Sequence, residues 1–210
     1  MAPSGPRRTA PWHPRVPAGD TPVRDRAPAW ESEDPQLRDL HLAGARLTPD
    51  DSLDGLEVLD VVLDGCDVAG LVATGGRATG LAVRSGRLRG VTWVRATFRD
   101  VLADDVTGED VSLRFSTLRR VEFRDCALPG LDLTEVTGER VRFVRCDLRC
   151  AKFDHARITG LEVSGCNLAG ATGVEALRGA RIHPDDIGSM VLSLAAAVGI
   201  VATEDVEGAG

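Results

Sequence analysis

The sequence predicts an all-β solenoid: a right-handed quadrilateral β-helix with four five-residue units in each coil. Three observations support this prediction. A five-residue period runs unbroken from residue 51 to residue 170, two positions of the period are apolar, and charges alternate in sign at steps of twenty residues. The expected boundaries are a disordered arm at 1–35, the β-helix at 36–170, a helical cap at 171–201 and a disordered tail at 202–210.

The N-terminal arm is defined by its composition. The first 35 residues contain eight of the eleven prolines, with five arginines and five acidic residues. Proline removes a backbone donor and cannot continue a helix or a central strand, so this stretch is expected to be disordered. Trp30 lies just before the first coil, where it is expected to cover the apolar end of that coil, and it is also a candidate partner anchor. Trp12 is either a candidate partner anchor or an ordinary mobile residue of the arm.

The repeat comprises 24 consecutive five-residue units without an insertion or deletion. The first position is Ala, Val, Leu or Cys in 20 of the 24 units, and the third is apolar in 22 of them. Residues two apart in an extended chain point to the same side, so these two positions form the interior. Glycine recurs at the fifth position, where a corner requires an unusual backbone conformation. Two further units, at 40–44 and 45–49, extend the coil upstream by about half a turn.

The number of units in each coil follows from residues that recur at multiples of twenty. Cys66, Cys126, Cys146 and Cys166 all occupy first positions and share one face only if a coil contains four units. Stacked coils would lie about 4.8 Å apart, the spacing of paired strands, which brings opposite charges together. The expected columns are Asp64/Arg84/Asp104/Arg124, Glu122/Arg142/Glu162, Glu57/Arg77, Asp67/Arg87, Arg89/Glu109, Asp125/Arg145 and Asp132/Lys152, with Arg120/Arg140 as a like-charge exception.

The units CDLRC, CNLAG, LDLTE and CDVAG resemble the A-(D/N)-L-x-x motif of the pentapeptide repeat proteins. The resemblance covers residues 40–170. It implies a quadrilateral right-handed β-helix in which third-position Leu or Phe fills the axis and a small first-position residue packs beside it. The structural core is then expected to include Cys66, Cys126, Cys146, Cys166, Phe123, Phe143, Phe153, Leu148 and Leu168.

A helix is expected after the repeats, from residue 184 to residue 198, preceded by a short helical turn and a strand remnant. Pro184 suits the first helical position, Asp185 and Asp186 suit the positive end of the helix dipole, and Gly199 ends the helix. The last coil of a solenoid exposes apolar side chains that need a cover. The helix therefore either caps its own chain or contributes a homodimer contact, as the resemblance implies for relatives associated with topoisomerase protection. The candidate residues for this cap or dimer surface are Ile187, Met190, Val191, Leu194 and Val198.

No enzymatic chemistry is expected, and no cofactor or metal. The inward cysteines lie in a line, which does not suit tetrahedral zinc, and they are interpreted as small buried hydrophobic residues. Cys150 points outward and is interpreted as an incidental surface thiol. The glycine-rich units lack the Lys-Ser/Thr ending of a phosphate loop. Because the inward positions are used for packing, no catalytic cleft is expected.

Charge and composition limit the partners. The net charge is −7, which argues against direct binding to nucleic acid. No apolar run reaches 18 residues, so no membrane span is expected. The five cysteines, without an export signal, favour a cytoplasmic location.

Two functions remain. The first is a non-enzymatic protein–protein interaction or scaffold module with an unknown partner. The alternative is a DNA mimic that binds type II topoisomerase (gyrase) and protects it from inhibitors. Residues 38–162 carry 18 basic and 21 acidic residues in rows of alternating sign, a weak imitation of a polyanion. The sequence therefore favours the interaction module.

Overall fold

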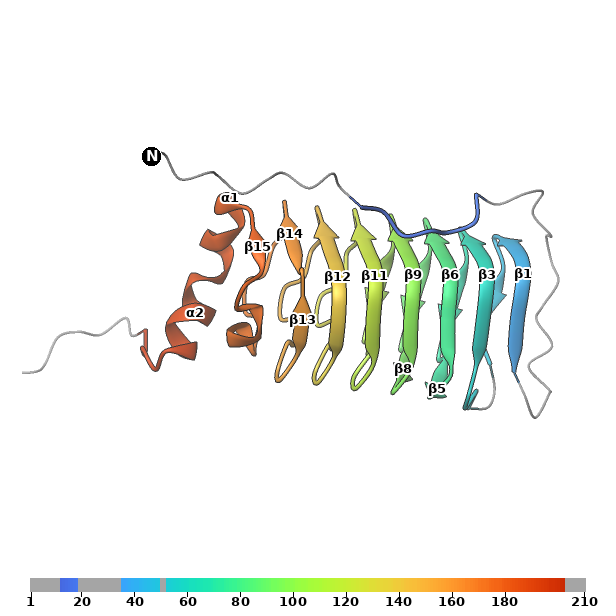
Figure 1. The fold of residues 1–210 in the computed structure, drawn as a ribbon, viewed down its shortest axis with the longest axis horizontal. Coiled ribbons are helices and arrows are strands. Elements are labelled where there is room, and N and C mark those ends of the chain that lie inside the picture. The colour runs from blue at the N-terminus through green and yellow to red at the C-terminus, as the bar shows by residue number, and fades with distance from the viewer. Residues whose placement is uncertain (1–11, 19–34, 50–51, 203–210) are drawn as a thin grey trace, which may run out of the picture.

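The computed structural model describes residues 12–18, 35–49 and 52–202, and it is a parallel β-solenoid with a helical cap at its C-terminal end (Figure 1). The largest sheet has the order β1-β3-β6-β9-β11-β12-β14-β15, with β13 paired to β12. A second sheet has the order β10-β7-β4-β2, and β5 pairs with β8. The strands are β1 (Gln36–Ala43), β2 (Arg46–Leu47), β3 (Glu57–Asp64), β4 (Asp67–Ala69), β5 (Val72–Thr74), β6 (Arg77–Arg84), β7 (Arg87–Arg89), β8 (Thr92–Val94), β9 (Thr97–Asp104), β10 (Thr107–Glu109), β11 (Thr117–Arg124), β12 (Thr137–Val144), β13 (Arg157–Thr159), β14 (Glu162–Ser164) and β15 (Arg181–Ile182).

Strand register confirms four units in each coil. Glu57 pairs with Arg77, and Arg77 pairs with Thr97, so each step between coils is twenty residues. The first step is one longer, because Gln36 pairs with Glu57. A further unit, residues 35–39, precedes the two upstream units of the repeat pattern, with Leu37 buried. Pro35 at its first position hid this unit from the repeat pattern.

The corners share one backbone conformation. Every fifth position from 55 to 170 has a positive φ, and fourteen of these 24 residues are not glycine. Asp or Asn at the second position supports some corners through its side chain. The Oδ1 atoms of Asp132, Asp147 and Asn167 accept hydrogen bonds from the backbone N–H two residues later, at 3.0, 3.2 and 3.0 Å.

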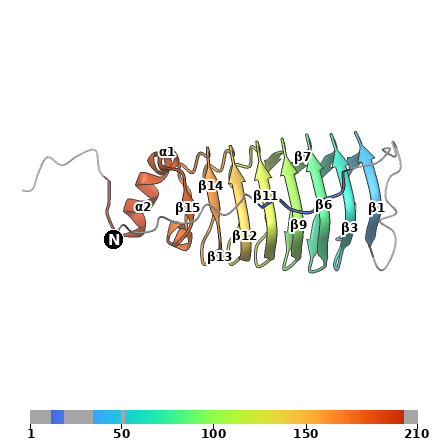
Figure 2. The same ribbon diagram turned by 45° about the horizontal axis from the view of Figure 1, so that its top comes forward.

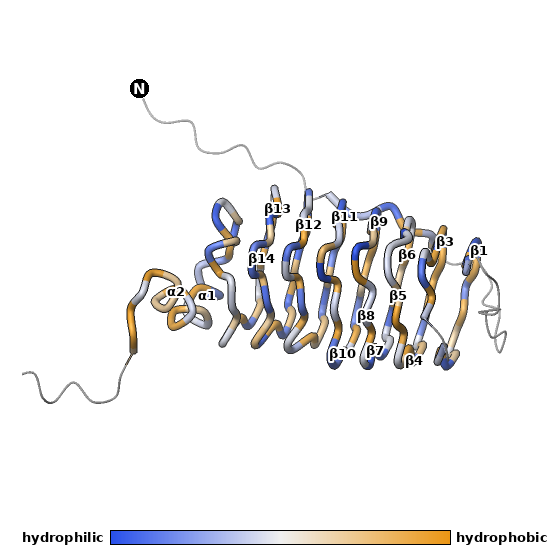
Figure 3. The backbone as a smooth tube through the Cα atoms, turned by 90° about the horizontal axis from the view of Figure 1, so that it is seen from below, coloured by the Kyte–Doolittle hydropathy of each residue, from blue (hydrophilic) through white to orange (hydrophobic). Residues whose placement is uncertain are grey.

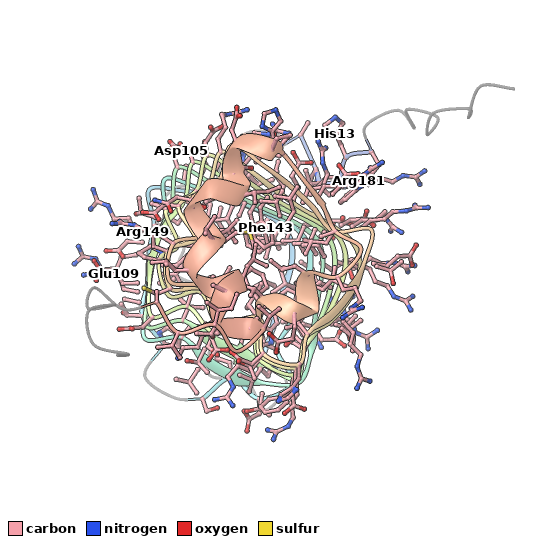
Figure 4. The ribbon with its side chains drawn as sticks, turned by 90° about the vertical axis from the view of Figure 1, so that its left-hand side faces the viewer. His13, Asp105, Glu109, Phe143, Arg149 and Arg181 are labelled. Carbon is pink, nitrogen blue, oxygen red and sulfur yellow. The ribbon has the colours of Figure 1, made fainter. Side chains whose placement is uncertain are left out.

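The axis is apolar along its length. The nine residues expected in the structural core are buried. Phe143 lies inside the coil while the side chains of Asp105, Glu109 and Arg149 point outward (Figure 4). The rings of Phe123 and Phe143 stack with centroids 4.9 Å apart, and Phe153 meets Phe143 edge-on.

The interior is not completely filled, contrary to the expectation that packing would leave no hollow. A cavity of about 130 Å³ runs among the N-terminal and middle coils, lined by apolar residues from Leu37 to Leu128. The third-position residues that line it include Val83 and Ala103, which are smaller than Phe143 and Phe153 of the later coils. The residues that line the cavity are all apolar.

The cap is less regular than the single helix expected over 184–198. It consists of η1 (Val174–Leu177), then α1 (Pro184–Ile187), η2 (Gly188–Met190) and α2 (Val191–Ala197). The 3₁₀ turn of η2 interrupts the helix. Met190 is buried on the end of the coil, and Ser189 Oγ accepts a hydrogen bond from Leu168 N at 3.0 Å. The expected start at Pro184 and the end near Gly199 are both observed.

Candidate interaction surfaces

The most distinctive surface is a face of the largest sheet on which residues 12–18, here named the strap, lie across the strands (Figures 1 and 2). At one end Arg142 Nη1 donates to Trp12 O at 3.1 Å. At the other, Arg84 donates to the carbonyl oxygens of Pro17 and Ala18 at 3.5 and 3.1 Å. The strap thus extends across four coils.

Two further contacts hold the middle of the strap. The backbone N–H of Arg15 donates to Asp100 Oδ1 at 3.1 Å. His13 Nδ1 lies 3.2 Å from Glu122 Oε2. Trp12, Pro14 and Val16 are partly buried while His13 and Arg15 are exposed, which is the alternation of an extended chain.

The face beneath the strap, named the strap face, contains outward-pointing side chains that are nevertheless buried. Ala82 occupies an outward second position and is 0% exposed, whereas Ala127, at the same position on the next side of the coil, is partly exposed. The carboxylate of Glu122 is likewise 1% exposed. Besides His13, it contacts Arg124 at 2.5 Å and Arg142 at 3.5 Å. The buried charge is therefore compensated by cations.

The strap differs from the expectation of a disordered arm over residues 1–35, because residues 12–18 are placed against the coil. Trp12, a candidate partner anchor, packs on its own chain, with its ring 6.0 Å from the guanidinium of Arg142. Trp30 lies outside the described residues, so its expected contact with the first coil stays a prediction. The sequence did contain a signal for this face: Val62, Ala82 and Leu102 are apolar at an outward position on three successive coils.

The charge columns have the predicted register, but only part of them form ion pairs. Three of the expected columns form ion pairs between stacked residues: Glu57–Arg77 at 2.9 Å, Asp125–Arg145 at 2.6 Å and Glu122–Arg142–Glu162 at 3.5 and 3.2 Å. Elsewhere an arginine reaches another partner. Arg89 pairs with Asp67 at 2.8 Å, and Arg84 donates to the strap. The like charges of Arg120 and Arg140 are compensated separately, because Arg120 forms an ion pair with Asp100 and Arg140 forms one with Glu139.

The ion pair between Asp100 and Arg120 connects the strap to the coil. Hydrogen bonds from the Arg120 guanidinium hold the pKa of Asp100 below its ordinary value, and the strap's backbone N–H at Arg15 acts in the same direction. Asp100 is buried and stays a carboxylate at neutral pH. It can therefore accept hydrogen bonds from both the coil and the strap.

The outer side of the cap forms a second surface. Ile187, Val191, Leu194 and Val198 are 43%, 53%, 38% and 73% exposed, whereas Met190 is buried. Of the five cap or dimer candidates, only Met190 covers the coil. The tube in Figure 3 shows hydrophobic residues along α2 and in the residues that follow it.

Three of the four inward cysteines, Cys126, Cys146 and Cys166, lie on successive coils as expected. A hydrogen bond with Cys126, together with burial, raises the pKa of Cys146 to about 12. The contact with Cys146, together with burial, also raises the pKa of Cys166. These thiols stay protonated, which is the state expected of cysteines that pack as apolar residues. Within the described ranges, no group of three or more His, Cys, Asp or Glu side chains could hold a metal ion, and no helix is long and apolar enough to cross a membrane.

The five-residue repeat and the four-sided coil define a parallel β-solenoid that resembles the pentapeptide repeat proteins. No family model and no curated protein matches the chain. Among solved structures, it is similar to two trypsin-treated variants and the full-length form of QnrB1, a plasmid-mediated fluoroquinolone resistance protein. The first variant is 14% identical with a TM-score of 0.35, and the alignment covers 80% of this chain and 100% of that one. The second is 15% identical with a TM-score of 0.33 and coverages of 79% and 99%. The full-length form is 15% identical with a TM-score of 0.30 and coverages of 79% and 100%.

Proposed function

We propose that this protein is a non-enzymatic protein–protein interaction or scaffold module. The supporting observation is that one face of the coil already holds an extended peptide chain through hydrogen bonds from outward side chains. Inward residues fix the coil, so outward residues are available for recognition at a regular spacing of about 4.8 Å. Such a rod offers long faces for docking rather than a pocket for chemistry.

Site-specific photo-cross-linking in the native host tests this function. A photoreactive residue is placed at exposed position Asp64, Val72, Arg87 or Arg157, one on each of the four sides of the coil. We expect one side to give a defined adduct with another protein and the other sides to give little. Equal labelling from every side, or no adduct at all, would contradict the proposal.

The topoisomerase alternative is testable with the same protein. Rows of alternating charge, several of them closed as ion pairs, give a weak polyanionic surface. We expect the purified full chain at micromolar concentration neither to inhibit gyrase supercoiling nor to relieve fluoroquinolone poisoning. Clear protection of gyrase would favour the topoisomerase-binding function over the interaction module.

Self-association is a second candidate property, supported by the exposed apolar residues of the cap. Val191, Leu192 and Val198 are each more than half exposed and lie at the end of the rod. Two copies that meet end to end would cover these side chains, and each fully buried one would contribute about 1.5–3 kcal/mol. This homodimer would leave the long sides of both coils accessible to partners.

A further inference from the structure

We propose that the strap face is a docking surface for an extended, proline-containing peptide of a partner protein, and that residues 12–18 occupy it in cis until such a peptide displaces them. This inference rests on the proposed function as an interaction module. It adds the place on the coil and the chemical class of the ligand.

Most hydrogen bonds between the coil and the strap are made to backbone atoms of the strap. Arg142 and Arg84 donate to carbonyl oxygens at the two ends of the strap, and Asp100 accepts from an amide between them. An extended peptide from another protein offers the same groups, as in other modes of peptide recognition that read the main chain. The face therefore does not require the strap's full sequence.

The chemistry of the contacts favours proline in the ligand. Proline has a carbonyl but no N–H, so it can accept from an arginine without leaving a donor unpaired. Arg84 makes this contact with Pro17. Proline also keeps a peptide extended before it binds, which lowers the entropy lost on docking. An aromatic residue at the end near Arg142 and a hydrogen-bonding side chain near Glu122 complete the pattern.

The strap lies outside the core of the coil. The inward residues of the same strands, such as Val101, Phe123 and Phe143, belong to the axial core, whereas the hydrogen bonds of the strap are made with outward side chains. If the strap leaves, Glu122 becomes hydrated and keeps Arg124 and Arg142 as partners. The apolar surface exposed is limited to outward side chains such as Val62, Ala82 and Leu102. The coil can thus stay folded while its ligand is exchanged.

A tethered ligand has an effective concentration in the millimolar range, so a free peptide competes poorly with an intact strap. The test therefore compares the full wild-type chain with a full-chain variant that weakens the strap, Trp12→Ala combined with His13→Ala. A fluorescein-labelled peptide with the sequence of residues 12–18 is titrated with each protein, and binding is followed by fluorescence anisotropy. A peptide of scrambled sequence serves as the control.

We expect the labelled peptide to bind the strap variant at least about tenfold more tightly than the wild type, because the competitor in cis is weakened. Adding Arg84→Ala to the strap variant should weaken binding, and Arg142→Gln provides a second test of the face. Arg89→Ala, on the β10-β7-β4-β2 sheet, should leave binding unchanged. Circular dichroism establishes that each variant keeps its coil.

Absence of binding to the strap variant, equal affinity for both proteins, or equal losses from Arg84→Ala and Arg89→Ala would overturn this inference. These outcomes are distinguishable from failure of the proposed function. If photo-cross-linking still identifies a partner on another side of the coil, the interaction module stands without this docking surface.

Discussion

Corner residues of the coil adopt a left-handed backbone conformation whether or not they are glycine. Non-glycine corner residues adopt φ values near +50°, as at Ser85 with φ of 47° and Asp100 with φ of 54°. The left-handed conformation costs a residue with a Cβ about 1–2 kcal/mol, and the ladder of the solenoid compensates for it. The sequence pattern located these corners but could not show that non-glycine residues share the conformation, because that depends on contacts between coils.

Gly75 and Gly76 provide a matched pair for this argument. Both have positive φ, at 72° and 74°, but a Cβ at Gly75 would meet nothing within 4 Å, whereas one at Gly76 would lie 2.1 Å from Leu56 O. We expect Gly75→Ala to lower the free energy of unfolding by about 1 kcal/mol and Gly76→Ala to lower it by considerably more. Urea denaturation of both variants measures the difference. Similar losses would show that the close approach to Leu56 is relieved by a small backbone shift.

Asp100 should make stability depend on acid pH. Its pKa is lowered in the folded protein by Arg120, so its contribution is complete above the unfolded-state pKa of about 4 and is lost as the pH falls through the folded-state value. We expect Asp100→Asn to cost about 1–3 kcal/mol at neutral pH, as for other hydrogen bonds to charged groups. The difference from the wild type should shrink below about pH 4. Urea unfolding across this pH range is the measurement, and a difference that does not change with pH would assign the effect to shape rather than charge.

At the level of elements, register was predictable and side-chain pairing was not. A period of twenty residues fixes which positions stack, but a long arginine side chain can reach several acceptors once it is there. Arg89 thus contacts Asp67 rather than closing a pair with Glu109 directly beside it. The break in the cap helix at Gly188–Met190 had no clear signal in the helical pattern, because it arises from Met190 and Ser189 fitting the end of the coil.

The columns along β9, β11 and β12 predict unequal effects of two charge changes. Arg124 supports the buried carboxylate of Glu122 at 2.5 Å, whereas Arg89 makes an exposed pair. We expect Arg124→Glu to cost about 3 kcal/mol or more, because it removes a partner from a buried charge and adds a like charge. Arg89→Ala should cost less than about 1 kcal/mol. Thermal unfolding measures the change in Tm of each variant, and equal changes would mean that the charge columns add little to stability.

At the scale of the whole molecule, the return of part of the arm to the coil could not be predicted from the composition of the arm. The disorder prediction rested on composition, and the strap is held by side chains of Arg84, Asp100, Glu122 and Arg142 that are distant in sequence. The apolar residues Val62, Ala82 and Leu102 at an outward position indicate that this surface is covered, but they do not indicate which segment covers it. The exposed cap, by contrast, follows from where α2 sits on the last coil.

The cap also predicts an oligomeric state. If the exposed residues of α2 mediate self-association, light scattering should give a mass near twice the 22.3 kDa of the chain. Leu194→Asp should restore the monomer without loss of the coil, because Leu194 lies outside the core. A wild-type protein that remains monomeric at all accessible concentrations would exclude this homodimer.

The hollow among the earlier coils has a mechanical consequence. Because each coil touches only its neighbours, local cohesion varies along the rod, weakest beside the void and strongest around Phe143 and Phe153, which pack edge-on and do not line the void. The coils of such a rod should unfold in one direction, from β1 toward β12. Amide hydrogen exchange should record this as a gradient of protection that increases toward the aromatic segment.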